Sequence, residues 1–236
     1  EAFCGMQEHI HSEQCMKAET PCQLEAHTHI ESCYSDITAD LETSDDWEMT
    51  LADMVRGPTT KENVVLVAKS QLGYLESERN FQVDAQGVRR GITRYGQWYG
   101  NPYGDWSAMF VSFCLHYAGI DREAIAYESN AERWVSVLTA REQYAAADAY
   151  TPVPGDLVFM DLDDNGFADT VAIVKSQEEN RLTVYMGDTG NGAVEQLEYL
   201  LADAPVETEQ KVLLPGDILG YGILPEKEIP ATAKAP

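Results

Sequence analysis

The sequence predicts an α+β protein, and the order of its segments is the main reason. Periodic apolar segments typical of helices fill the first half, whereas short alternating segments separated by turn residues follow Pro154. Helices that precede a run of strands are typical of an α+β fold with an antiparallel sheet. With 236 residues, 44% of them hydrophobic, the chain is long enough for one medium domain and a small appendage.

An internal repeat of the form C-x4-H-x-H-x3-C occupies the N-terminal segment, with an offset of eighteen residues between its copies. The first copy contains Cys4, His9, His11 and Cys15, and the second contains Cys22, His27, His29 and Cys33. Each copy supplies two thiolates and two imidazoles, the ligand number of a closed structural zinc site. We therefore expect residues 1–36 to bind two structural zinc ions, which would stabilise a segment too short for its own core. The alternative is two disulfides, Cys4–Cys15 and Cys22–Cys33, which leave the repeated His-x-His unexplained.

Four helices are expected between this repeat and Pro154. Residues 37–57 form an acidic linker that becomes periodic from Trp47, which indicates a short connecting helix. A second, amphipathic helix is expected over the segment from Thr59 to Gly73, with a threonine cap and a glycine stop. The third starts at Ser107, and further helical signals cover residues 127–147.

Ser107 opens a run of thirteen mostly apolar residues that ends at Gly119, which predicts a buried central helix. A helix N-terminus carries unpaired N–H groups and the positive end of the helix dipole. That environment activates a thiol, whereas a hydroxyl also needs an adjacent base. Five aromatic residues crowd the approach to this helix, namely Tyr95, Trp98, Tyr99, Tyr103 and Trp106. Such residues either pack as a local core or line a groove for peptide or sugar.

Five strands are expected after Pro154, over residues 156–161, 170–175, 182–186, 194–200 and 218–223. The first two are joined by a loop that reads D-x-D-x-N-G-x-x-D. This is the start of a calcium loop, whose oxygen ligands would be Asp161, Asp163, Asn165 and Asp169. Ala172 stands where a closing glutamate is expected. The alternative, which we favour, is a polar hairpin loop, because Asp-Asn-Gly is itself a strong turn signal.

Four blocks of the sequence carry a resemblance to a known family. They are DWSAMFVSFCLHYAGI at 105–120, PGDLVFMDLDDNGFADTVAIV at 154–174, YMGDTGNG at 185–192 and ILGYG at 218–222. In order and spacing they resemble the CHAP amidase/peptidase family of the papain-like, NlpC-type clan. The resemblance covers roughly Asn63 to Leu224, about two-thirds of the chain. It implies a papain-like CHAP domain over residues 58–225, followed by a Pro/Ala-rich linker over residues 226–236 that leads to further domains of a longer parent chain.

The resemblance implies a site that has lost its catalytic groups. The cysteine nucleophile of the family falls on Ser107, its histidine base on Thr170, and its orienting Glu and Asn on Met186 and Asp188. Threonine has no group that titrates near neutral pH, so Thr170 cannot act as the base. We therefore expect an inactive, degenerate triad of Ser107, Thr170 and Asp188. Its Ser107 and Thr170 side chains should lie within direct or one-water hydrogen-bond reach.

Composition limits the setting and the partners. A net charge of −24 and a pI near 4.3 argue against nucleic acids and anionic membranes as partners. No apolar run is long enough for membrane insertion. A start at Glu1 is expected of a mature form after removal of a signal peptide. The repeat resembles units near the N-terminus of large surface proteins of Gram-positive bacteria, so we expect a secreted or cell-surface location.

Three functions remain open from the sequence. The first is a degenerate CHAP-like domain with a binding or scaffolding role, whose partner is a peptidoglycan stem peptide or another protein or glycan ligand. The second is an active peptidoglycan amidase or endopeptidase in which Ser107 replaces a native cysteine. The third is a structural spacer in a large secreted enzyme or adhesin.

Overall fold

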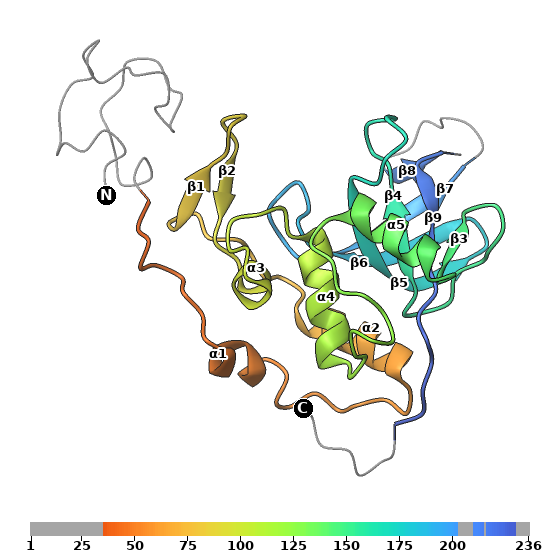
Figure 1. The fold of residues 1–236 in the computed structure, drawn as a ribbon, viewed down its shortest axis with the longest axis horizontal. Coiled ribbons are helices and arrows are strands. Elements are labelled where there is room, and N and C mark those ends of the chain that lie inside the picture. Colours follow the sequence, from red (N-terminus) through yellow and green to blue (C-terminus); the bar gives the residue numbers. More distant parts are fainter. Residues whose placement is uncertain (1–34, 203–209, 215, 230–236) are drawn as a thin grey trace. The chain divides into compact units, whose positions relative to one another are not determined.

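The computed structural model describes residues 35–202, 210–214 and 216–229 (Figure 1). All eight predicted zinc ligands lie outside the described residues, and so does most of the predicted linker 226–236. By its internal contacts the chain divides into two compact units. The first combines residues up to Asp45 with Glu76–Gly104, and the second combines Asp46–Leu75 with the chain from Asp105 onward. The segment Glu76–Gly104 of the predicted 58–225 domain thus belongs to a different unit from its flanking residues.

A hairpin and a short helix form the centre of the first unit. They are β1 (Phe81–Val83), β2 (Arg89–Gly91), which pairs with β1 in antiparallel fashion, and α3 (Arg94–Tyr99). The buried amide of Asn80 donates to the carbonyl oxygen of Ala39 at 2.9 Å and so ties residues 35–45 to the hairpin. A Cβ at Gly91 would lie 2.2 Å from the carbonyl oxygen of Ser77, so this position requires glycine.

Among the described residues, four helices belong wholly or partly to the second unit. They are α1 (Ser44–Met49), which spans the boundary between the units, α2 (Thr60–Ser70), α4 (Ser107–Tyr117) and α5 (Ala131–Ala140). The side chains of Thr59 and Asn130 accept hydrogen bonds from backbone N–H groups in the first turns of α2 and α5. Every residue of α4 except His116 is buried, as the predicted central helix requires.

Seven strands of the second unit form one sheet, in the order β3-β9-β4-β5-β6-β7-β8 (Figure 1). They are β3 (Tyr144–Ala146), β4 (Leu157–Met160), β5 (Thr170–Glu178), β6 (Arg181–Met186), β7 (Glu195–Leu201), β8 (Lys211–Leu213) and β9 (Ile218–Gly222). Neighbouring strands are antiparallel except β7 and β8, which are parallel. The predicted α+β class is confirmed, with a mixed sheet.

Strand β4 is buried on both faces of the sheet. Its residues Val158 and Met160 belong to an apolar cluster that also contains Ala172 of β5, Leu213 of β8 and Tyr221 of β9. The alternate residue Phe159 points to the other face, where its ring lies 6.2 Å from that of Trp134 on α5. One face of the sheet is therefore covered by helices, and the other packs within the apolar cluster.

One expectation about local structure was right only in part. The helical segment 127–147 contains a helix only at Ala131–Ala140, and Tyr144–Ala146 form the edge strand β3. The chain turns at Glu142, which has a φ of 57°, and Ala145 then pairs with Tyr221 of β9. An alanine-rich strand is stabilised by its partner rather than by its own propensity, so its sequence resembles a helix. The short elements β1, β2, β8 and α3 also escaped prediction.

A buried ion pair joins the helices to the sheet. The ammonium group of Lys61 on α2 lies 2.7 Å from Oδ1 of Asp156, whose side chain is fully buried. Asp156 also accepts hydrogen bonds from the Tyr150 hydroxyl and from the backbone N–H groups of Val153 and Leu224. Burial and the neighbouring carboxylate raise the pKa of Tyr150 to about 12, so its hydroxyl remains a donor. Every charge at this junction is thus matched by partners.

Removal of either partner of this pair should destabilise the second unit strongly. Lys61→Met and Asp156→Asn are each expected to lower the free energy of unfolding by about 3–5 kcal/mol, because each leaves a buried polar group uncompensated. The matched control is Glu198→Gln, which breaks the half-exposed Arg181–Glu198 pair and should cost at most about 1 kcal/mol. Urea unfolding followed by circular dichroism measures both. Equal effects of Lys61→Met and Glu198→Gln would contradict this account.

Candidate functional site

The candidate site is centred on the start of α4. Ser107 is the first residue of this helix and is 7% exposed. The first turn contains no acidic residue, and the side chain of the N-cap residue Trp106 makes no capping hydrogen bond. The ring of Trp106 packs edge-on against that of Tyr74, with centroids 6.0 Å apart. Ser107 therefore lies at a helix start that is shielded by aromatic rings.

Asp188 binds the backbone just before this helix. Its Oδ2 accepts a hydrogen bond of 2.8 Å from the backbone N–H of Trp106. Asp188 adopts a φ of 59°, in the left-handed region that aspartate tolerates better than most residues. The preceding residue must be glycine, because a Cβ at Gly187 would lie 2.7 Å from Cβ of Phe110 on α4. The turn after β6 is thus fixed against the first turns of α4, and the Asp188 carboxylate compensates the positive end of the helix dipole.

Thr170, which we expected at the position of a catalytic base, is the first residue of β5. It is 7% exposed, and its Oγ1 has no hydrogen-bond partner among the described residues. A direct hydrogen bond between Thr170 and Ser107 is therefore absent. Ile173 of β5 pairs with Tyr185 of β6 in antiparallel fashion. Thr170 lies three residues before Ile173, and Asp188 lies three residues after Tyr185, so both follow the same end of this strand pair. The one-water distance between Thr170 and Ser107 stays a prediction.

Thr189 is a second unpartnered hydroxyl, in the turn after β6. It is 7% exposed, and no hydrogen-bond partner for its Oγ1 is present in the part of the chain that the structure describes. Sequence reasoning missed this residue, and it also missed the contacts of Gly187 and Tyr74. The sequence block YMGDTGNG could have pointed to Gly187 and Thr189, because these two residues flank Asp188 in it.

The histidine and the cysteine that the structure describes both lie further along α4 than Ser107. His116 is the only histidine within the described residues, and it lies in the last turn of α4, with its ring edge-on to those of Tyr117 and Tyr127. Burial lowers the pKa of His116, and the nearby Arg122 lowers it further. Cys114 is fully buried, and burial raises the pKa of its thiol well above the usual value. The thiol is therefore a core group.

The five predicted groove aromatics fall in different units. Tyr95, Trp98, Tyr99 and Tyr103 belong to the first unit and Trp106 to the second. Tyr95 is fully buried, and the Tyr103 hydroxyl donates to Oδ1 of Asn80 at 2.8 Å, so these two residues support the first unit. A groove that combines all five residues stays a prediction.

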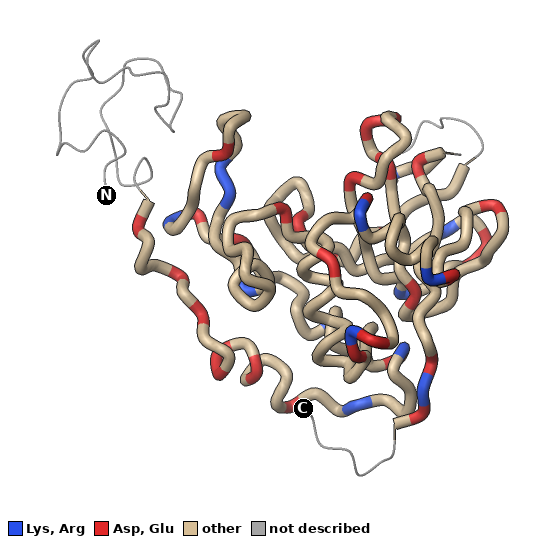
Figure 2. Tube along the Cα trace, in the orientation of Figure 1, with Lys and Arg blue, Asp and Glu red and all other residues tan. Residues whose placement is uncertain are grey.

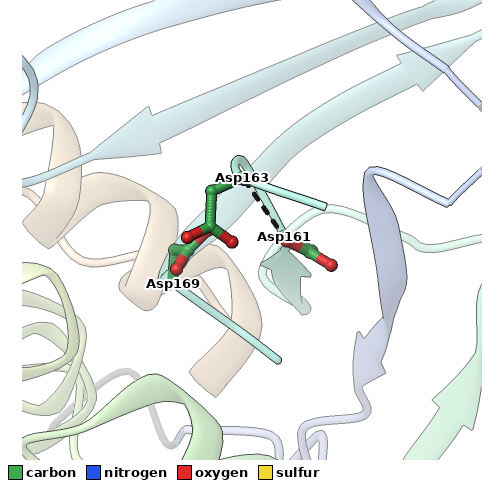
Figure 3. A group of neighbouring side chains, drawn as sticks. All are labelled: Asp161, Asp163 and Asp169. Atoms are coloured by element: carbon green, nitrogen blue, oxygen red, sulfur yellow. Dashed lines mark hydrogen bonds between the residues drawn. The ribbon is translucent and has the colours of Figure 1, made fainter. Parts of the chain in front are cut away.

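The loop between β4 and β5 gathers the three predicted carboxylates of the calcium motif (Figure 3). Asp161, Asp163 and Asp169 each offer an oxygen within 4.8 Å of the others. Both oxygens of Asp161 accept backbone N–H groups of the loop, including that of Gly166 at 2.7 Å. Burial raises the pKa of Asp161, but these N–H groups outweigh it and lower the pKa below its usual range. The carboxylate therefore organises the turn, which favours the hairpin alternative; calcium binding, with Asn165 as a further ligand, stays a prediction.

Comparisons with protein-family models, with curated proteins and with solved structures found no match. Among the described residues, no helix has the length and apolar character needed to cross a membrane.

The unpartnered hydroxyl of Thr170 gives a test that separates a site residue from a structural one. Thr170→Val should leave the free energy of unfolding unchanged or raise it by up to about 1 kcal/mol, because no hydrogen bond is lost. The matched control is Thr60→Val, since the buried Thr60 hydroxyl donates to the Pro225 carbonyl and accepts from the Lys227 N–H. That change should cost about 1–3 kcal/mol. A loss at Thr170 as large as that at Thr60 would show that the Thr170 hydroxyl has a structural partner.

Proposed function

We propose that residues 58–225 form a catalytically degenerate CHAP-like domain of a secreted or cell-surface protein, with a binding or scaffolding role. The observation that carries the proposal is the placement of the three motif positions. Ser107 starts the central helix, Asp188 binds the backbone at that start, and Thr170 is the first residue of β5, which pairs with the strand that leads into the Asp188 turn. These positions support a papain-like arrangement, and none of the three residues carries a thiol or an imidazole.

The arrangement also favours binding over catalysis on chemical grounds. A serine at this position needs a base that takes its proton, and threonine has none to offer. Asp188 already accepts a backbone N–H, and its negative charge opposes the formation of a second anion at the same helix start. What the site retains is a helix N-terminus, hydroxyl groups and aromatic rings, which suit recognition of a peptide. The partner we propose is a peptidoglycan stem peptide.

Restoration of catalytic groups tests the proposed loss of activity. The unmodified protein and Ser107→Cys should release no amino groups from purified peptidoglycan above background, because Thr170 offers no base in either. Ser107→Cys combined with Thr170→His is expected to recover at most a trace, since a triad without its third member loses several orders of magnitude in rate. Circular dichroism controls for folding. Robust cleavage by the unmodified protein or by Ser107→Cys alone would identify a working enzyme.

The binding role has its own test. The unmodified protein should sediment with insoluble peptidoglycan, and soluble stem-peptide fragments should displace it if the groove is the binding site. Sedimentation that the fragments leave unchanged would place the contact elsewhere on the protein. Absence of sedimentation would refute the binding role and favour a structural spacer.

We propose further that the N-terminal repeat binds two structural zinc ions, on the ligand count of its two copies alone. Protein purified without chelator should contain about two zinc ions per chain. After unfolding with EDTA and without reductant, all five cysteines should react as thiols. The two-disulfide alternative leaves only Cys114, which is a free, buried cysteine, and so yields a single thiol. That result would refute the zinc proposal.

A further inference from the structure

A pocket lies on the face of the sheet that the helices do not cover. It has a volume of about 610 Å³, within the range of small-molecule sites. Its wall combines residues of β5, β7, β8 and β9 with the segment that follows β3. Strands β8 and β9 are separated by four others in the sheet, yet both line the pocket, so the sheet curves around it.

This pocket is distinct from the Ser107 site. Of its lining residues, Tyr150, Leu201, Ile218 and Tyr221 belong to or pack against the apolar cluster on one face of the sheet. Gly187, which contacts α4, follows Met186 of that cluster, so α4 lies against the opposite face. A ligand in this pocket and a peptide at Ser107 would therefore occupy different faces of the sheet.

The lining offers a defined set of polar groups around an apolar wall. Gln177 contributes a buried Oε1 that has no hydrogen-bond partner among the described residues. Its terminal amide turns about one broad torsion, so this oxygen can meet a donor in the pocket. Asp148 is the only charged side chain among the described lining residues, and it is exposed. The rings of Tyr150 and Tyr221 lie 6.1 Å apart and, with Leu201 and Ile218, provide the apolar surface.

These groups select the chemistry of a ligand. An unpartnered carbonyl oxygen and a carboxylate both accept hydrogen bonds, so the ligand should carry N–H donors. An anion would find no lysine or arginine in the described lining. It would also be repelled by the negative field of this strongly acidic protein, whose Asp and Glu positions are spread over the described chain (Figure 2). A cation is favoured by the same field. The aromatic and aliphatic wall suits a ring or a short hydrocarbon chain.

We infer that this pocket binds small amines or amides that carry an apolar group, with Gln177 and Asp148 as acceptors. A ligand of this kind would explain why β5 buries the Oε1 of Gln177 without a hydrogen-bond partner among the described residues. A buried carbonyl oxygen without a donor destabilises a fold, whereas a bound N–H group satisfies it. The pocket is thus a second recognition site that does not depend on the residues at Ser107.

Three probes of the same size separate the chemistries. Benzamide is a neutral donor, benzylamine a cationic donor and benzoate an anion without a donor. Titrations of the full chain followed by amide NMR should shift the resonances of Gln177, Leu201 and Ile218 with benzamide and benzylamine and leave them unchanged with benzoate. Gln177→Leu should weaken both binding probes by about five- to tenfold. Asp148→Asn should weaken benzylamine alone, by about two- to fivefold.

Two controls keep the test decisive. Asp164→Asn removes an exposed carboxylate that does not line the pocket, and it should leave all three titrations unchanged. Gln177→Leu should leave the unfolding temperature unchanged or raise it, because the lost oxygen had no partner. Benzoate binding equal to that of benzamide, shifts that map outside the pocket, or no shift up to the solubility limit of the probes would each overturn the inference.

Discussion

The buried ion pair between Lys61 and Asp156 joins three parts of the second unit that are distant in sequence. Lys61 belongs to the first turn of α2, Asp156 directly precedes β4, and the N–H of Leu224 binds the same carboxylate just after β9. The fit leaves no spare room, since a Cβ at Gly155 would lie 2.8 Å from Cβ of Lys61. A buried pair of this kind fixes one arrangement of helix and sheet, because any shift would strand a charge away from water.

The placement of the candidate site follows from this junction. β4 begins at Asp156 and pairs with β5, whose first residue is Thr170, so the position of β4 sets that of Thr170. β5 then pairs with β6, and β6 leads into the turn that contains Asp188. The hydrogen bond from the Trp106 N–H to Asp188 closes the chain of contacts at the start of α4. The sheet register and this hydrogen bond together hold the residues of the candidate site.

The sequence predicted the features that depend on local chemistry. Thr59 and Ser107 mark helix starts by residue type, and the alternation after Pro154 marks β4, β5 and β6, so these elements lie where expected. The strand β3 was missed because its alanines have no strand preference without β9. Asp156 was expected as the first residue of a strand, and its role in a buried ion pair depends on Lys61, which lies 95 residues away. Asp188 was identified from the family motif, but its bond to Trp106 depends on tertiary structure.

The chain leaves the second unit at Leu75 and returns to it at Asp105, and these two points are neighbours. Tyr74 and Trp106 pack ring against ring, Leu75 bridges to Ala193, and Trp106 bonds to Asp188 nearby. The segment Glu76–Gly104 is therefore joined to the second unit at two points that lie close together, and lengthening a loop whose ends are held in this way costs little additional entropy. We expect insertions and deletions within this segment to leave the sheet intact.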